Sequence, residues 1–330
     1  MVTRRTLVKG MAVAPVAGAA LLSRVDAVWA QSDKPVTVGS KNFTEQFILG
    51  NMYALLLKEA GIPVETSLNL GGTGVAQGAL VKGDIDLYPE YTGTGLTEIL
   101  KIPIDSVKNA TPAAGLATPI AAGSPAAGGA GSIDERVYQI VKDEYKKQFN
   151  LVWLDQVPFN DTQALAVKRD FSEQQGFTTI SQLAEKAGDL TVVAPSDFSE
   201  REDGALGLQR VYNLKFGKVL GVDPGIRYQA LDQGQADVVL AFGTDGQVSG
   251  MDLVLLKDDK GLWPPYHVAP VVRQETLDAN PKLADALNQV APLLTDEVMS
   301  KLNYRVDGPD KEEPEDVAKS FLKDQGLIGG

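Results

Sequence analysis

Short apolar runs and helical apolar spacing follow one another along the chain and predict alternating strands and helices. Four runs have the length and the β-branched composition of buried strands: VTVGS (36–40), IDLYPE (85–90), LTVVAP (190–195) and ADVVLAF (236–242). After the first run, Thr44 is expected to cap an amphipathic helix that ends at Gly61. Such alternation is typical of parallel α/β sheets.

The pattern breaks once and then resumes. Residues 110–132 are uncharged and rich in alanine, glycine and proline, which indicates a flexible surface insertion without chemistry. Beyond it, Val137, Val141 and Tyr145 at helical spacing predict a helix, and PEDVAKSFLKDQG (314–326) predicts another near the C-terminus.

Two pairs of segments repeat each other. Two segments share Ala-Leu, Gly and Asp at the same spacing: ALVKGDIDLYPEYTGT (79–94) and ALDQGQADVVLAFGTD (230–245). When the two segments are aligned, Tyr91 and Phe242 occupy the same position. NFTEQ (42–46) and DFSER (197–201) each follow a predicted strand and are expected to supply a threonine or serine helix cap. The repeats predict two similar α/β lobes that face a common cleft, although glycine turns recur in all such sheets and chance similarity stays an alternative.

The first thirty residues have the pattern of an export signal. Arg4 and Arg5 precede an apolar run of small residues at 11–22, and a cleavage site is expected after Ala30. The paired arginines favour the twin-arginine route. The run is too short to span a bilayer, which argues against the alternative of a membrane anchor. We therefore expect a soluble periplasmic protein.

Composition narrows the chemistry further. The 330 residues are enough for two domains, and 44% of them are hydrophobic. The formal net charge is −12, and it becomes −15 once the export signal, with four basic residues and one acidic residue, is removed. A surface this acidic repels nucleic acid and anionic lipid. We therefore expect neither as a partner. The absence of cysteine excludes disulfides, thiol nucleophiles and thiolate metal sites.

An exported enzyme is the alternative from a different class, and its motifs are weak. The single histidine, His267, is accompanied by neither a GxSxG elbow nor an HExxH spacing, so we expect a structural role for it and no metal. The glycines of LGGTGVAQG (70–78) follow a GxGxxxG spacing, unlike the dinucleotide fingerprint. A tight turn between a strand and a helix explains them as well, and no cofactor is predicted.

The residues expected to line the cleft are Lys41, Tyr91, Thr94, Asp197, Arg201, Phe242 and Tyr266. The aromatic rings suit a quaternary ammonium, because the negative face of a ring attracts a cation that cannot donate hydrogen bonds; each contact supplies about 0.5–2 kcal/mol. The basic side chains and the threonine, near helix N-termini, suit a carboxylate. Together they predict a zwitterionic ligand.

Six segments resemble the osmoprotectant-binding proteins of ABC importers, the family that takes up glycine betaine, choline, carnitine and proline betaine. They are residues 38–61, 69–95, 159–167, 196–212, 226–246 and 258–273. The most specific is YPEYTGT after GDIDL, and the resemblance covers nearly the whole chain outside the signal and the insertion. It implies the two-lobed α/β fold of type II periplasmic binding proteins, closure on the ligand at a hinge, and delivery to a membrane permease.

In that family, tyrosines surround the trimethylammonium group and basic residues hold the carboxylate. The resemblance implies cage roles for Tyr91 and Tyr266, and for Phe242, which stands where members have tyrosine. Gln163 stands where betaine binders have a tyrosine, so one wall is missing and betaine is expected to bind weakly. The carboxylate-binding positions are matched by Lys41, Thr94 and Arg201, and positions of polar contacts by Asp161 and Asp197.

These observations predict a monomeric, non-enzymatic receptor that binds a quaternary ammonium solute of the glycine betaine type for an ABC importer. Residues 34–159 and 267–330 are expected to form the first lobe and 160–266 the second, with hinges near Phe159 and Tyr266. Choline, carnitine, ergothioneine and an amino acid are the alternative ligands.

Overall fold

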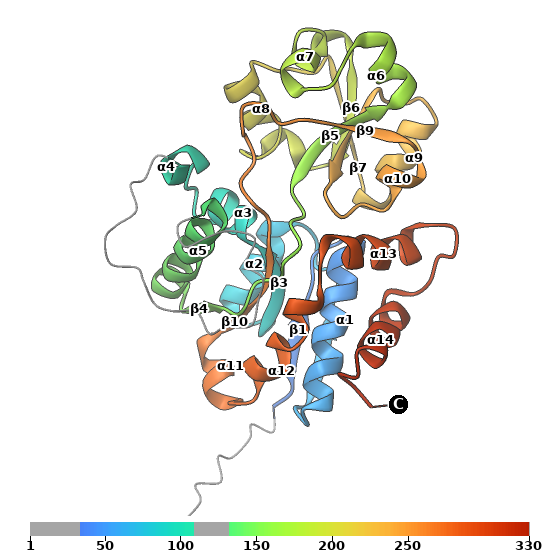
Figure 1. Cartoon of the computed structure of the whole chain (residues 1–330). Helices are drawn as coiled ribbons and strands as arrows, with labels where there is room; N and C mark the ends of the chain where they lie inside the picture. Colours follow the sequence, from blue (N-terminus) through green and yellow to red (C-terminus); the bar gives the residue numbers. More distant parts are fainter. Residues whose placement is uncertain (1–33, 109–131, 330) are drawn as a thin grey trace, which may run out of the picture. The chain divides into compact units, whose positions relative to one another are not determined.

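The computed structural model describes residues 34–108 and 132–329; the predicted export signal and nearly all of the 110–132 insertion lie outside them. In these residues ten strands form two five-stranded sheets (Figure 1). The first sheet has the order β2 (Val64–Ser67), β1 (Val36–Gly39), β3 (Leu87–Tyr91), β10 (Val268–Arg273) and β4 (Leu151–Trp153). The second has the order β7 (Lys218–Val222), β6 (Thr191–Pro195), β8 (Val238–Phe242), β5 (Gln163–Lys168) and β9 (Leu253–Leu256).

Helices cover both faces of each sheet, which explains why central strands such as β1 and β8 are mostly apolar and buried. On one face of the first sheet lie α1 (Thr44–Glu59), α12 (Leu283–Asn288), α13 (Asp296–Asp307) and α14 (Pro314–Asp324). On its other face lie α2 (Thr73–Lys82), α4 (Ile104–Lys108) and α5 (Ile133–Phe149). The remaining helices are α3 (Thr92–Thr94), α6 (Arg169–Gln175), α7 (Ile180–Ala184), α8 (Ala205–Tyr212), α9 (Arg227–Asp232), α10 (Gln247–Gly250) and α11 (Gln274–Ala279). Within 34–108 and 132–329, no helix has the length and apolar character needed to cross a bilayer.

Both sheets are mixed, so the prediction of parallel sheets is wrong for two strands. β1 is parallel to β2 and β3, but β10 is antiparallel to β3 and β4. In the second sheet β6 is parallel to β7 and β8, whereas β5 is antiparallel to β8 and β9. The chain enters β5 and β10 from the other sheet, without the helical crossover that makes successive strands parallel.

The two sheets repeat one strand order, which explains the first repeated segment. Reading each sheet from its edge, β2, β1, β3, β10 and β4 correspond to β7, β6, β8, β5 and β9. Tyr91 and Phe242 are the last residues of the equivalent strands β3 and β8. Gly83 and Gly234, which precede these strands, both have left-handed backbones, with φ of +82° and +69°. Glycine is favoured there because it has no Cβ to clash.

The aspartates shared by the repeats also have one structural role. The Asp86 carboxylate accepts a 2.8 Å hydrogen bond from the N–H of Thr37 in β1. The Asp237 carboxylate accepts a 2.8 Å hydrogen bond from the N–H of Thr191 in β6. Each aspartate therefore fixes the central strand of its sheet to the strand beside it.

The predicted helix caps are wrong in both copies of the second repeat. Phe43 precedes α1 in an extended conformation, and the Thr44 hydroxyl donates instead to Asp307 at 2.7 Å. Ser199 lies in a one-turn 3₁₀ helix, and α8 begins only at Ala205. Thr44 is thus engaged in a tertiary contact rather than in capping, and Ser199 is exposed.

The chain passes between the sheets in two segments, 154–162 and 257–267, which lie side by side. The N–H of Asp161 donates to the carbonyl of Tyr266 at 3.2 Å, and the N–H of Tyr266 donates to Asn160 Oδ1 at 2.7 Å. These segments contain the predicted hinge residues, while the predicted lobe boundaries stay a prediction.

His267 joins the same two segments. Its Nδ1 lies 3.1 Å from the carbonyl oxygen of Val157 and 2.8 Å from that of Phe159. Two carbonyl oxygens can only accept, so Nδ1 carries a hydrogen and donates it. This contact is structural, as the sequence predicts for His267.

Candidate functional site

A cavity of about 110 Å³ is lined by residues that follow strands of both sheets, together with residues of α13. All nine residues predicted to bind ligand line it: Lys41, Tyr91, Thr94, Asp161, Gln163, Asp197, Arg201, Phe242 and Tyr266. The two repeated segments therefore meet at one site. Their roles in binding stay predictions, but their proximity is a property of the fold.

Five aromatic rings line the cavity, two more than the sequence predicts. Besides Tyr91, Phe242 and Tyr266, the lining contains Phe43 and Phe198. The Phe43 and Tyr91 rings stack, with centroids 6.0 Å apart and an interplanar angle of 28°. The signal for the two additional rings was present, because they occupy the same position in NFTEQ and DFSER. Phe43 and Phe198 thus add two aromatic rings to the three that the sequence predicts.

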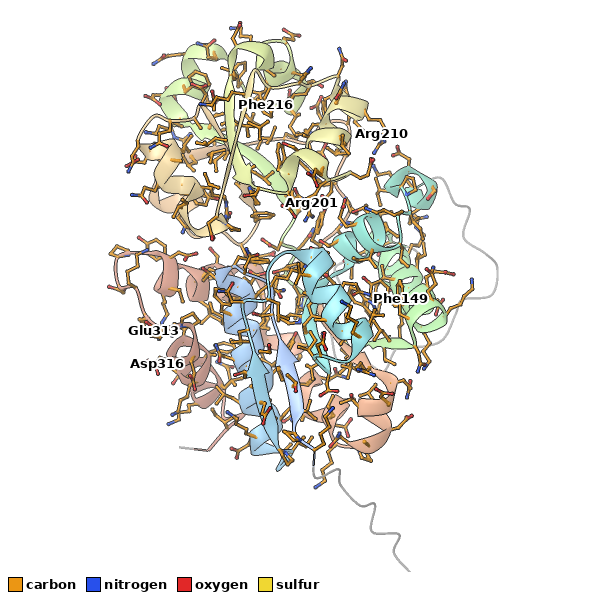
Figure 2. The ribbon with its side chains drawn as sticks, turned by 180° about the vertical axis from the view of Figure 1, so that it is seen from behind. Phe149, Arg201, Arg210, Phe216, Glu313 and Asp316 are labelled. Carbon is orange, nitrogen blue, oxygen red and sulfur yellow. The ribbon has the colours of Figure 1, made fainter. Side chains whose placement is uncertain are left out.

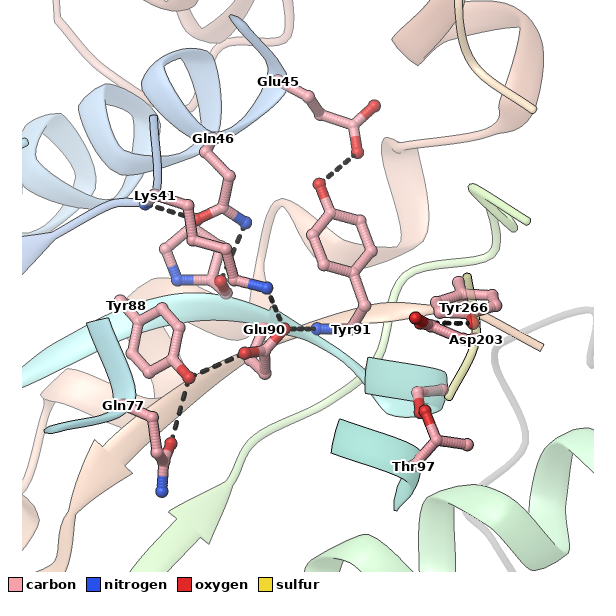
Figure 3. Close-up of polar contacts among 12 residues, drawn as sticks. Lys41, Glu45, Gln46, Gln77, Tyr88, Glu90, Tyr91, Thr97, Asp203 and Tyr266 are labelled. Carbon is pink, nitrogen blue, oxygen red and sulfur yellow. Dashed lines mark hydrogen bonds and ion pairs between the residues drawn. The ribbon is translucent and has the colours of Figure 1, made fainter. Parts of the chain in front are cut away.

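Lys41 enters the cavity already paired with a buried carboxylate (Figure 3). Its Nζ donates to Glu90 Oε1 at 2.5 Å, and Glu90 also accepts from the Tyr88 hydroxyl and the Tyr91 N–H, both at 2.7 Å. Lys41 is 4% exposed and Glu90 is 0% exposed. Burial lowers the pKa of Lys41, and the Glu90 charge opposes this effect. Glu90 and Tyr88, whose roles the sequence leaves open, therefore hold Lys41 in place.

Arg201 is held in the same way by an aspartate that sequence reasoning missed. Arg201 lies in the segment that leads into α8 (Figure 2). Its Nε and one terminal nitrogen each donate to Asp203 at 2.7 Å, and the other terminal nitrogen lies 3.3 Å from Asp197. The Tyr266 hydroxyl donates to Asp203 at 2.9 Å and accepts from Gln163 Nε2 at 3.1 Å. Burial acts to raise the pKa of Asp203, but the Arg201 guanidinium outweighs it and keeps that pKa below its usual range. One carboxylate thus orients a predicted carboxylate-binding residue and a predicted cage ring.

Phe242 already contacts a cation of the protein itself. The Arg227 guanidinium carbon lies 4.9 Å from the centroid of the Phe242 ring and 4.8 Å from that of Tyr228. The same guanidinium donates to Asp245 at 2.5 Å. Tyr228 is buried and lies in α9. Arg227 and Asp245 line the cavity, and the sequence analysis selected neither.

A second feature that the sequence did not predict is a threonine hydroxyl that lies between two carboxyl groups of the cavity lining. Glu45, 3% exposed, accepts from the hydroxyl of Tyr91 at 2.8 Å, from Asn303 Nδ2 at 2.9 Å and from Thr244 Oγ1 at 2.6 Å. The same Thr244 Oγ1 lies 2.7 Å from Asp161 Oδ1, and the Thr244 N–H donates to that oxygen at 3.1 Å. Burial raises the pKa of Glu45 to about 7. Burial, followed by the charge of Glu45, raises the pKa of Asp161 well above its usual range.

The cavity lining contains more acidic than basic side chains. The acidic ones are Glu45, Asp161, Asp197, Asp245 and Asp307, and the basic ones are Lys41, Arg201 and Arg227. Each basic group already has a carboxylate partner. A ligand with a positive charge is therefore favoured over an anion. In the part of the chain that the structure describes, no three ligand-type side chains gather as they would around a metal ion.

Comparison with known proteins agrees with this geometry. The model of the family described as the substrate binding domain of ABC-type glycine betaine transport system matches residues 34–324. The ergothioneine transport permease/ergothioneine binding protein EgtU of Helicobacter pylori (strain G27) is 33% identical over 296 residues, which are 89% of this chain and 48% of that protein. The chain thus spans about half the length of that relative. The glycine betaine-binding protein YehZ of Escherichia coli (strain K12) is 31% identical over 308 residues, 90% of this chain and 92% of that protein.

Solved structures agree as well. The crystal structure of a glycine betaine/carnitine/choline ABC transporter matches with a TM-score of 0.65 and 29% identity, over 89% of this chain and 100% of that chain. The predicted two-lobed α/β fold of the type II periplasmic binding proteins is thereby confirmed.

Proposed function

Because the chain belongs to the family of substrate-binding domains of ABC-type glycine betaine transport systems, we propose that it is an exported receptor that binds a quaternary ammonium solute and delivers it to a membrane permease. The ligand sits in the cavity between the lobes, which close on it by bending at 154–162 and 257–267. The protein works as a monomer in the periplasm, in uptake of compatible solutes.

One observation carries the proposal: five aromatic rings and an excess of carboxylates surround a cavity of small-molecule size. Rings attract a cation without accepting a proton, and each desolvated contact is worth up to about 2 kcal/mol. Lys41 and Arg201 have N–H groups beyond those used by Glu90, Asp203 and Asp197, because an ammonium has three donors and a guanidinium five. With Thr94, these groups bind the carboxylate of a zwitterion.

A more polar amine is the second candidate ligand. Gln163 brings an amide to the cavity wall where betaine binders have a tyrosine, and an amide both donates and accepts hydrogen bonds. A relative at 33% identity is named for ergothioneine. Ergothioneine is a trimethylammonium betaine with additional polar atoms, so it uses both the rings and the amide.

The function is tested by calorimetric titration with glycine betaine, choline, carnitine, proline betaine and ergothioneine. We expect stoichiometric binding of at least one quaternary amine, and recovery of the ligand unchanged. Tyr91→Ala is expected to weaken that binding by roughly two- to thirty-fold, because it removes one ring contact. The matched variant Tyr91→Phe keeps the ring and is expected to weaken it less. Turnover of the ligand would favour the enzyme alternative, and no binding across the panel would overturn the proposal.

Gln163→Tyr is expected to strengthen glycine betaine binding by roughly two- to thirty-fold, because it restores an aromatic wall of the cage. The measurement is the ratio of dissociation constants for glycine betaine and ergothioneine in the variant and the wild type. If Gln163 instead serves a more polar ligand, ergothioneine binding falls in the same variant. An unchanged ratio would show that the missing wall is already supplied, for example by Phe43 or Phe198.

A further inference from the structure

The Thr244 hydroxyl lies between two carboxyl groups, and its hydrogen count constrains their protonation. Thr244 Oγ1 is 2.6 Å from Glu45 Oε2 and 2.7 Å from Asp161 Oδ1, both within hydrogen-bonding distance. A hydroxyl has one hydrogen, so it donates to only one of the two oxygens. The other contact needs a hydrogen on the carboxyl group itself. The observed arrangement therefore holds one proton on the Glu45 and Asp161 pair.

The ionised groups of the cavity are paired elsewhere. Lys41 binds Glu90, and Arg201 binds Asp203 and Asp197. Arg227 binds Asp245, whose charge disfavours ionisation of both Glu45 and Asp161. The contacts recorded for Glu45 and Asp161 come from neutral donors only.

The remaining titratable groups around the pair do not supply a positive charge. From α1 Tyr53 and from β3 Tyr91 face Glu45, and burial raises the pKa of both phenols. Asp307, on α13, lines the same cavity and accepts from Thr44. Phenols and carboxyl groups carry no positive charge in either protonation state, and the nearby guanidinium and ammonium groups already have carboxylate partners.

We propose that the closed site holds one proton shared by Glu45 and Asp161 through Thr244, and that a permanently cationic ligand takes the place of this proton. The proposal rests on the proposed function, since it concerns how the same cavity recognises the charge of its ligand. When the cation is bound, both carboxylates are ionised and face it as counter-charges. When a neutral molecule of the same shape is bound, the proton stays.

The direction of the pH effect follows from this exchange. The pKa of Glu45, raised to about 7 by burial, means that the closed site without a cation keeps its proton up to about that pH. Above it, closing over a neutral ligand leaves an uncompensated buried charge. Preference for the cation over the neutral molecule is thus lowest in acid, increases as the pH rises toward 7, and levels off above it.

The test compares pairs of ligands of the same shape, in which one has a positively charged quaternary nitrogen and the other a neutral carbon at the same position. Choline and 3,3-dimethylbutan-1-ol form one such pair, and glycine betaine and 3,3-dimethylbutanoate form another, with ionisation of the butanoate taken into account. We expect the ratio of the dissociation constant of the carbon compound to that of the amine to rise from pH 5.5 to about 7, by up to about tenfold per pH unit. Because the free protein is common to both titrations, its own protonation cancels from the ratio.

Glu45→Gln is expected to flatten the pH dependence of this ratio. The amide is neutral and carries hydrogens at every pH, whereas the wild-type pair holds its shared proton only at lower pH. Asp161→Asn is expected to do the same and serves if the first variant does not fold. The matched control is Glu200→Gln, because Glu200 is exposed and occupies the position of Glu45 in the second repeat, DFSER. The control is expected to keep the slope of the wild type.

The outcomes separate this inference from the proposed function. If a quaternary amine binds but the ratio is independent of pH in the wild type, the shared proton is overturned and the receptor function stands. If the slope is present and survives in Glu45→Gln and Asp161→Asn, another group carries it and the inference is again overturned. If no quaternary amine binds, the proposed function fails, and the inference fails with it.

Discussion

Lys41→Met is expected to lower the free energy of unfolding by about 3–5 kcal/mol, because it leaves the Glu90 carboxylate buried without its cation. The Tyr88 hydroxyl and the Tyr91 N–H remain as donors to Glu90, but neither carries charge. Methionine has a similar volume to lysine, so the change removes the charge rather than the packing. Urea denaturation followed by circular dichroism measures the loss.

The double variant Lys41→Met with Glu90→Gln is the decisive companion. Removing both members of a buried ion pair is far less costly than removing one, so we expect most of the lost stability to return. Lys147→Met is the surface control, because its pair with Glu144 is solvated and screened, so we expect its loss to change stability little. Equal stability of Lys41→Met and the wild type would contradict the view that Glu90 depends on Lys41.

Asp203→Asn is expected to lower both stability, by about 3 kcal/mol, and affinity for the ligand, by at least about tenfold. The amide keeps the size of the side chain but not its charge. The Arg201 guanidinium then loses its bidentate partner, and the Tyr266 hydroxyl loses its charged acceptor. Arg201 and Tyr266, which both line the cavity, thus lose the carboxylate that orients them.

Thermal unfolding and calorimetric titration measure the two effects separately. Asp197→Asn is the matched control for stability, because Asp197 lies 3.3 Å from Arg201 and its side chain is 47% exposed, so its loss costs less than about 1 kcal/mol. If Asp203→Asn melted and bound ligand like the wild type, Asp203 would not be the group that orients Arg201 and Tyr266.

Much of the fold follows from local pattern. The apolar runs at 36–40, 190–195 and 236–242 contain β1, β6 and β8, the run at 85–90 contains β3 except its last residue, and the helix expected near the C-terminus is α14. What the pattern does not contain is strand direction. β5 and β10 are apolar like their neighbours, but their orientation depends on the crossing from the other sheet, which no local period records.

In the site as well, some positions follow from local sequence and others depend on tertiary contacts. The positions of Tyr91 and Phe242 at one cavity follow from strand ends and from the repeat, which are sequence features, whereas Tyr266 lies in the crossing segment 257–267, outside both. Charge partners do not follow, because Lys41 and Glu90 are 49 positions apart, and Glu45 and Thr244 are 199 apart. Even Asp203, two residues from Arg201, was missed, because a charge that close in sequence appears to be a solvated neighbour until its burial is known.

The twofold repetition of strand order has a consequence for how such a receptor changes its ligand. Each half contributes a ring at the end of its central strand and a second ring from the segment after β1 or its equivalent β6. A substitution of one ring in one half leaves the strands and the core of the opposite half unchanged. We therefore expect the ligand preference to change through single substitutions in the cavity lining. The hydrophobic cores that keep each half folded need not change with them.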